Sequence, residues 1–186
     1  MTTSLPKVPR FLILLLLFAL PTASFAEGSF LSGTVTEGFR GLQWGSTPGE
    51  ALKVIPDLYF DHYALPAGDK TPSKIYCRKN EDRKIGLVTF RKVEYWFKED
   101  SFYKITACLD SHYGPRTLVT DAERDFGKLR EEMNLHYGEP VKLKTGLGVT
   151  DFDKYASWHI GRTVVSLSYK ETGGSVSELY LEIKFE

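Results

Sequence analysis

One segment of the chain, residues 120–140, constrains the fold more than any other because it reads as an amphipathic helix with both ends marked. Thr120 and Glu123 have the spacing of a capping box, in which each side chain binds a free backbone N–H group of the first turn. Gly138 suits the left-handed position that follows a helix, and Pro140 prevents the helix from continuing. The apolar residues recur at helical spacing and form one stripe: Ala122, Phe126, Leu129, Met133 and Tyr137. Such a helix must pack its apolar face against another element.

The residues on both sides of this helix alternate between apolar and polar, which predicts β-strands. We expect strands at 74–79, 92–97 and 102–109 before the helix and at 155–160, 163–169 and 178–185 after it, with a further extended piece within 141–150. A second, shorter helix begins at the capping box of Thr47 and Glu50 and ends at Pro56. The predicted fold class is therefore α+β, with one antiparallel sheet that carries two helices on one face and leaves the other face open.

The predicted order of elements repeats, with a helix and three strands followed by a helix and three strands. The letters of the two halves also echo each other, because residues 93–99 (VEYWFKE) and 165–171 (VSLSYKE) match at several positions. Strand alternation alone produces similar echoes. We expect a single α+β domain at 39–186, and interpret it as a tandem αβββ repeat with pseudo-repeats at about 39–115 and 116–186.

The first 26 residues read as a secretory signal peptide. Lys7 and Arg10 give a positive start, residues 11–20 are an unbroken apolar run, and Ser24-Phe25-Ala26 places small residues at the cleavage site. The alternative is an uncleaved membrane anchor, but a helix of about ten residues spans about 15 Å, half of the hydrocarbon core of a bilayer. We therefore expect a periplasmic or secreted protein without a stable membrane anchor after cleavage, with residues 27–38 as a flexible N-terminal arm.

Charge excludes some classes of partner. The full chain has 24 basic and 24 acidic residues, and removal of the leader leaves 22 basic and 24 acidic residues. A nucleic-acid-binding domain needs a basic face, which this balance does not favour. A chain with so little net charge is also only weakly attracted to an anionic membrane. The partner that we expect is another envelope protein, and the sequence does not set the oligomeric state.

Two segments carry a resemblance to a known family. FRGLQWGSTPGEAL at residues 39–52 and HYGEP at 136–140, followed by a strand that contains Trp158, resemble a family of uncharacterised exported bacterial proteins with no assigned activity. The order of helices and strands is also similar in outline to β-lactamase inhibitory protein and to the small lipoprotein subunit of the outer-membrane β-barrel assembly machinery. The present chain has no Cys near the cleavage site to carry a lipid. The similarity to β-lactamase inhibitory protein implies αβββ repeats and an inhibitor-like role, although a shared fold does not fix function.

The chain has two cysteines, Cys77 and Cys108, and export would permit a disulfide between them. Cys108 alternates with Lys104 on the polar side of its strand, whereas Cys77 shares a side with Ile75. If Ile75 points into the core, the two thiols lie on opposite faces of the sheet, so a Cys77–Cys108 disulfide is not favoured. Their spacing is also not that of a redox CxxC motif.

The sequence carries no recognisable motif for catalysis or metal binding. Its four histidines, His62, His112, His136 and His159, are not at ligand spacing, and there is no GxSxG, P-loop or dinucleotide-binding fingerprint. We therefore predict no cofactor, no metal and no catalytic residue. An enzymatic or ligand-binding role would use the long connection Asp57–Ser73, since connections of this length often carry function.

One pattern indicates a binding surface. On the strands, the phase opposite to the predicted core carries five residues that we take as candidates for protein binding: Tyr76, Trp96, Tyr155, His159 and Tyr180. Aromatic residues surrounded by charge are typical of protein–protein hot spots, although Tyr and Trp also favour strands that bind nothing. The leading expectation is a non-enzymatic protein-binding or inhibitor-like module that uses the open sheet face. The alternative is a periplasmic enzyme or ligand-binding protein with its site in Asp57–Ser73.

Overall fold

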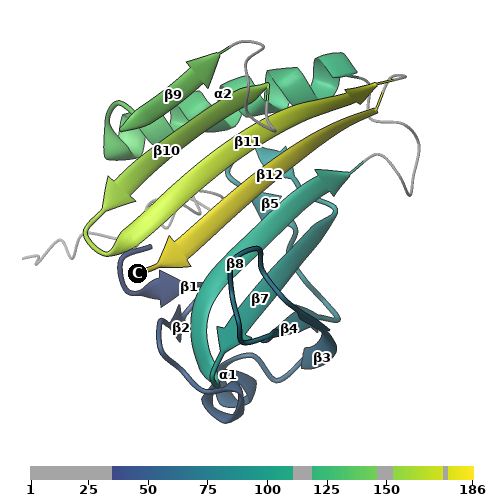
Figure 1. Ribbon diagram of the computed structural model, residues 1–186, viewed down its shortest axis with the longest axis vertical. Coiled ribbons are helices and arrows are strands. Elements are labelled where there is room, and N and C mark those ends of the chain that lie inside the picture. Colours follow the sequence, from purple (N-terminus) through teal and green to yellow (C-terminus); the bar gives the residue numbers. More distant parts are fainter. Residues whose placement is uncertain (1–34, 111–118, 146–152, 174–175) are drawn as a thin grey trace, which may run out of the picture.

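The computed structural model of the chain describes residues 35–110, 119–145, 153–173 and 176–186 (Figure 1). The signal peptide predicted at 1–26, most of the predicted arm at 27–38, and His112 lie outside these residues.

An eight-stranded antiparallel sheet dominates the fold, with the strand order β3-β4-β7-β8-β12-β11-β10-β9 (Figure 1). All six predicted strands are present, and a short strand lies within the extended piece predicted at 141–150. The strands are β3 (Leu58–Ala64), β4 (Ser73–Arg78), β7 (Lys92–Lys98), β8 (Ser101–Asp110), β9 (Lys142–Thr145), β10 (Lys154–Ile160), β11 (Thr163–Gly173) and β12 (Val176–Phe185).

Two tight turns set the register of the hairpins. Gly161, in the predicted two-residue turn between β10 and β11, has a φ of 62°, which glycine adopts without steric cost. The turn between β7 and β8 uses Glu99 and Asp100, with φ values of 50° and 59°. Two consecutive left-handed residues match the right-handed twist of the flanking strands.

The long helix α2 (Val119–Tyr137) packs against β10, β11 and β12. Its predicted apolar stripe is confirmed, because four of its five members are buried and Tyr137 is partly buried against the same core: Ala122, Phe126, Leu129 and Met133. Gly138 has a φ of 79°, as expected of the residue after a helix. The helix begins one residue before the predicted cap Thr120, whose side chain lies outside the described residues. None of the described helices is long and apolar enough to cross a membrane.

The short helix α1 (Pro48–Val54) has the predicted capping box, in which Thr47 and Glu50 bind each other's backbone N–H groups. Its Ala51 and the following Ile55 are buried in the same apolar cluster as the stripe of α2. The core is therefore one continuous cluster on the helix side of the sheet.

Two small hairpins share the covering of this core, which the sequence assigned to helices alone. They consist of β1 (Gly38–Phe39) with β2 (Leu42–Gln43), and of β5 (Lys84–Ile85) with β6 (Val88–Thr89). Phe39, Leu42 and Ile85 are buried in the cluster. The backbone N–H of Leu87 donates a hydrogen bond to the Glu132 carboxylate (3.2 Å), which joins the β5–β6 turn to α2.

Residues 35–38 belong to this domain, so the predicted arm extends too far along the chain. Val35 is buried, and its carbonyl oxygen accepts hydrogen bonds from the Trp44 indole (2.8 Å) and the Thr163 hydroxyl (3.1 Å). The Trp44 ring stacks on Phe102 with 4.8 Å between ring centroids.

Each half of the chain contributes one helix followed by four strands of the large sheet, and the halves meet where β8 pairs with β12. The sequence predicted three strands in each half. The additional strands are β3 and β9, which form the two edges of the sheet. After Leu58, most of β3 is exposed, so its residues lack the alternation that marks a half-buried strand.

Candidate functional site

The face of the sheet opposite the helices, which we call the open face, contains four of the five predicted binding residues. Strand pairing assigns the faces, because residues directly opposite each other in antiparallel strands point to the same side. Trp96 pairs with Lys104 and Tyr180 pairs with Cys108, both on β8. Tyr155 and His159 lie on β10 and reach the same face through their partners on β11.

Tyr76 lies on the other face, which corrects the prediction for this residue. It pairs with the buried Tyr95 and its ring lies edge-on to Phe97, 5.1 Å between centroids, on the core side. Its neighbour Ile75 pairs with Trp96 and is buried on the open face. Strand β4 therefore buries apolar side chains on both faces. Its own sequence does not show which of the two alternating sets of residues faces the helices.

Cys77 and Cys108 lie on the same face of the sheet, and not on opposite faces as the sequence suggested. Cys77 follows the phase of Ile75, so it lies on the open face, as Cys108 does. Neither of the two is part of a disulfide. They occupy β4 and β8, which are separated by β7, and two strand spacings amount to about 10 Å. A disulfide requires Cα atoms within about 7 Å of each other, so the distance between the strands prevents a disulfide. The predicted reason, that the thiols lie on opposite faces of the sheet, is wrong.

We expect Cys77 to resist alkylation in the folded protein. Its side chain is buried, and burial raises the pKa of the thiol to about 11, so the reactive thiolate is scarce at neutral pH. Because an unfolded thiol titrates near 8.5, the neutral form contributes stability at pH 7 that is lost as the pH rises towards 11. Mass spectrometry of a Cys108→Ser variant treated with iodoacetamide tests this. Equal rates of modification in the folded and urea-unfolded protein would contradict it.

Trp96 is held in one orientation at the centre of the open face. Its indole N–H donates a hydrogen bond to the Thr106 hydroxyl (2.9 Å), which donates to the Glu94 carboxylate (2.9 Å). The Lys104 ammonium lies 3.8 Å from the centroid of the Trp96 ring, within the range of a cation–π contact. These contacts fix the orientation of the Trp96 ring.

A hollow of about 360 Å³ lies beside this cluster on the open face. Two predicted residues, Tyr155 and Tyr180, line it together with small hydroxyl side chains and one carboxylate: Thr106, Ser166, Ser168 and Glu182. The Tyr155 hydroxyl is hydrogen-bonded to that of Ser166 (3.1 Å). Glu182 is paired with Lys104 (3.2 Å), which links the hollow to Trp96. We call this continuous surface, from Trp96 to Tyr155, the aromatic patch. His159 lies farther along β10 and does not line the hollow.

The residues that lie between the aromatic side chains were not predicted from the sequence. Ser166 and Ser168 occupy alternate positions of β11, between the buried Val165, Leu167 and Tyr169. Small polar residues that alternate with large buried ones leave space on the open face of the strand. This alternation is the sequence pattern that could have predicted the hollow. Thr106 carried no such signal, because its role depends on Trp96 and Glu94 from another strand.

A row of ion pairs borders the patch towards the β3 edge. Lys92 lies between Asp61 (3.0 Å) and Glu94 (2.8 Å). A hydrogen bond from Lys92 holds the pKa of the Asp61 carboxyl below its usual range, so this group is ionised at neutral pH. Such paired charges orient side chains and are poorly suited to exchange protons.

The alternative site at Asp57–Ser73 is altered by the structure, because β3 occupies Leu58–Ala64 and leaves residues 65–72 as the connection. Asp57 is bound by Arg78 (3.1 Å) and by the backbone N–H of Asn80 (3.0 Å). His62 contacts Asp61 (3.0 Å), away from the Asp57 pairing. Within the described part of the chain, no three His, Cys, Asp or Glu side chains are arranged to hold a metal ion.

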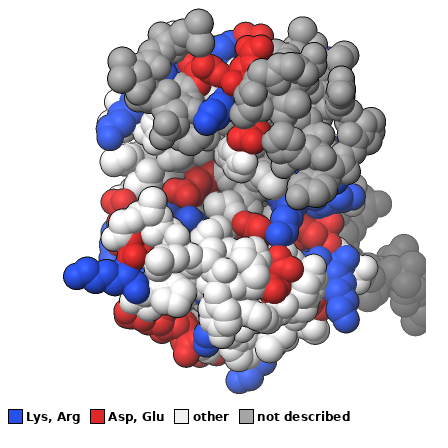
Figure 2. Space-filling view, turned by 45° about the vertical axis from the view of Figure 1, so that its right-hand side comes forward, with Lys and Arg blue, Asp and Glu red and all other residues white. Residues whose placement is uncertain are grey.

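Charged residues of both signs are interspersed on the side of the molecule seen in Figure 2. The described residues on this side therefore form no extended field of one sign. A mixed surface of this kind favours partners recognised by local contacts over partners attracted by net charge.

Comparison with known proteins adds no relative: no family model, no curated protein and no solved structure matches the chain.

Proposed function

We propose that the chain is an exported cell-envelope protein, without enzymatic activity, that binds another protein through its open face. The aromatic patch carries this proposal. It places Trp96, Tyr155 and Tyr180 on one face of the sheet, where the two tyrosines line a hollow that can receive a side chain of the partner.

The chemistry of the patch suits protein recognition. Trp and Tyr are enriched among interface residues that contribute most of the binding energy. The contribution of these residues to the binding free energy increases when their side chains are already ordered, because no side-chain entropy is then lost on binding. Trp96 satisfies this condition through its contacts with Thr106 and Lys104.

Export and the tandem repeat remain parts of the proposal. The sequence of residues 1–26 supports export to the periplasm or the medium. The symmetric strand order, with one helix and four strands in each half, supports descent from a duplicated unit. The resemblance in outline to β-lactamase inhibitory protein agrees with a binding role for such a unit.

The double variant Trp96→Ala, Tyr180→Ala is expected to weaken partner binding at least about tenfold, since residues of this type often contribute 2 kcal/mol or more each. The measurement is retention of the partner by the immobilised mature protein, with unfolding in urea followed in parallel. Glu131→Ala, on the exposed side of α2, is the matched control and should bind normally. Binding by the double variant at the control level would contradict the proposal. Unfolding of the double variant would show that these residues belong to the core, which also contradicts it.

A further inference from the structure

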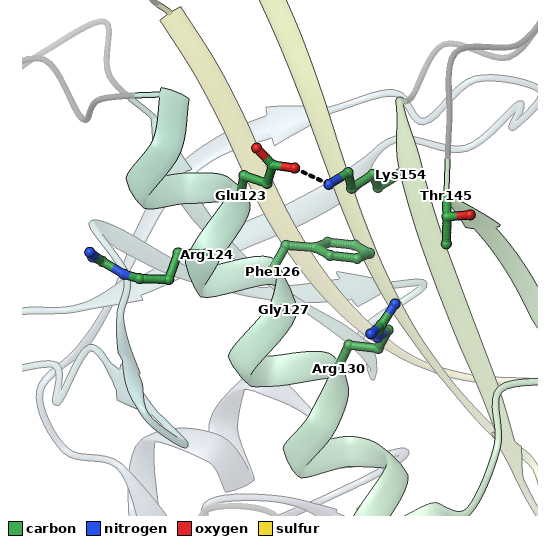
Figure 3. A pocket seen from close by; sticks show the side chains of 7 residues that line it. All are labelled: Glu123, Arg124, Phe126, Gly127, Arg130, Thr145 and Lys154. Atoms are coloured by element: carbon green, nitrogen blue, oxygen red, sulfur yellow. Dashed lines mark hydrogen bonds and ion pairs between the residues drawn. The ribbon is translucent and has the colours of Figure 1, made fainter.

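A second hollow, of about 400 Å³, lies on the helix side of the sheet between α2 and the strands β9 and β10. Figure 3 shows the Phe126 ring projecting from the helix towards the strands, with Lys154 on one side of it and Arg130 on the other. Gly127 and Thr145 complete the wall on the helix and on β9. The hollow thus lies over the edge of a core ring that is 2% exposed, between two cationic side chains, on the opposite side of the sheet from the aromatic patch.

Arg130 is the cation of this hollow that the described residues leave without an ion pair. Lys154 is paired with Glu123. Arg124 is paired with Asp121 (2.9 Å), and in Figure 3 its side chain points away from the other residues. The Nε of Arg130, in contrast, is buried and has no hydrogen-bond partner. A buried donor without a partner lowers the stability of the fold. A bound anion would accept a hydrogen bond from this donor and remove that cost.

Gly127 provides a second, independent observation. A glycine in the middle of a helix destabilises the helix relative to alanine. Packing does not require it, because a Cβ atom added at Gly127 would meet no atom within 4 Å. The neighbouring atoms therefore do not explain why this position is a glycine. The absence of a side chain keeps this side of the hollow open.

We propose that this hollow binds a small organic anion, specifically a carboxylate carried on a flat apolar group. A guanidinium matches the two oxygens of a carboxylate in a bidentate arrangement, which makes Arg130 the binding residue. The apolar part of the ligand would lie over the small accessible edge of Phe126 and along the aliphatic chains of Arg130 and Lys154. The volume lies at the lower end of the range for small-molecule pockets, which fits a ligand with a single ring.

Benzoate is the probe, and its binding to the mature protein is measured by chemical-shift changes in NMR spectra. We expect saturable shifts in residues around Phe126 and little response to inorganic phosphate. Arg130→Gln should weaken benzoate binding by about ten- to hundredfold, the range for a lost charge-assisted hydrogen bond. Gly127→Leu should abolish binding by filling the hollow, while raising the urea midpoint of unfolding because leucine favours a helix.

Arg124→Gln is the matched control, since Arg124 borders the hollow but points away from it, and it should bind benzoate like the unmodified protein. Three results would overturn the proposal: no saturable benzoate binding, equal binding by Arg130→Gln, or phosphate binding as strong as that of benzoate. Binding of benzoate by the Trp96→Ala, Tyr180→Ala variant should be unchanged, which keeps this test separate from that of the open face.

Discussion

A Trp158→Ala variant is expected to lose about 3–5 kcal/mol of unfolding free energy, the range for removal of a large aromatic side chain from a core. Trp158 lies on β10 beneath α2 and is 1% exposed. Its indole N–H donates a hydrogen bond to the carbonyl oxygen of Gly138 (2.9 Å), at the end of the helix. The substitution would leave a cavity and free this carbonyl, so the end of α2 would lose this attachment to the strand.

Urea unfolding followed by circular dichroism measures this loss. Trp158→Phe is the control, because it keeps most of the ring and removes the N–H donor, and we expect it to cost about 1–2 kcal/mol. If Trp158→Ala cost less than Trp158→Phe, the described packing of α2 on β10 would be wrong.

A Glu81→Ala variant is expected to lose about 3–5 kcal/mol of unfolding free energy, because it removes the carboxylate that pairs with the largely buried Arg40 guanidinium. The Glu81 side chain is 7% exposed and forms an ion pair with Arg40. It also accepts a hydrogen bond from the Tyr95 hydroxyl (3.0 Å) and lies 3.8 Å from the Nε of Arg78. Burial lowers the pKa of Arg40, which reflects the cost of holding its charge there. This cluster joins the β1–β2 hairpin to the sheet.

The matched control is an exposed ion pair, Arg124 with Asp121, in which Arg124 is 58% exposed. Arg124→Ala is expected to change the unfolding free energy by no more than about 0.5 kcal/mol. Glu81→Gln should fall between the two variants, because the amide can still accept hydrogen bonds but carries no charge. Equal effects of Glu81→Ala and Arg124→Ala in urea would show that the Glu81 cluster does not stabilise the fold.

The parts of the fold that the sequence predicted are those with a strong local signal. The stripe from Ala122 to Met133 has one buried side, and so do β7 and β8, so periodicity alone located them. The edge strand β3 has few buried residues and therefore no period to detect. In β4, Ile75 and Tyr76 are both shielded, on opposite faces, so the phase of the strand was set by its partners and not by its own letters.

The candidate site shows the same division. Trp96, Tyr155 and Tyr180 could be nominated because aromatic residues in a polar phase are visible in the sequence. Their assembly into one patch depends on the order of the strands, which places β12 next to β8 across about 70 residues of chain. The hollow beside Arg130 could not be predicted, because it depends on how α2 lies against β9. Gly127, a glycine in the middle of a helix, is its only trace in the sequence.

Site-specific photocrosslinking tests whether the open face binds a protein, as we propose. A photoreactive amino acid is placed at Tyr180 or Tyr155 in the aromatic patch, and at Leu135 on α2, which is 86% exposed. We predict one dominant adduct of the same mass from both patch positions in intact cells, greatly reduced when Trp96→Ala is added, and no such adduct from Leu135. No adduct from either patch position, or the same adduct from Leu135, would contradict the claim.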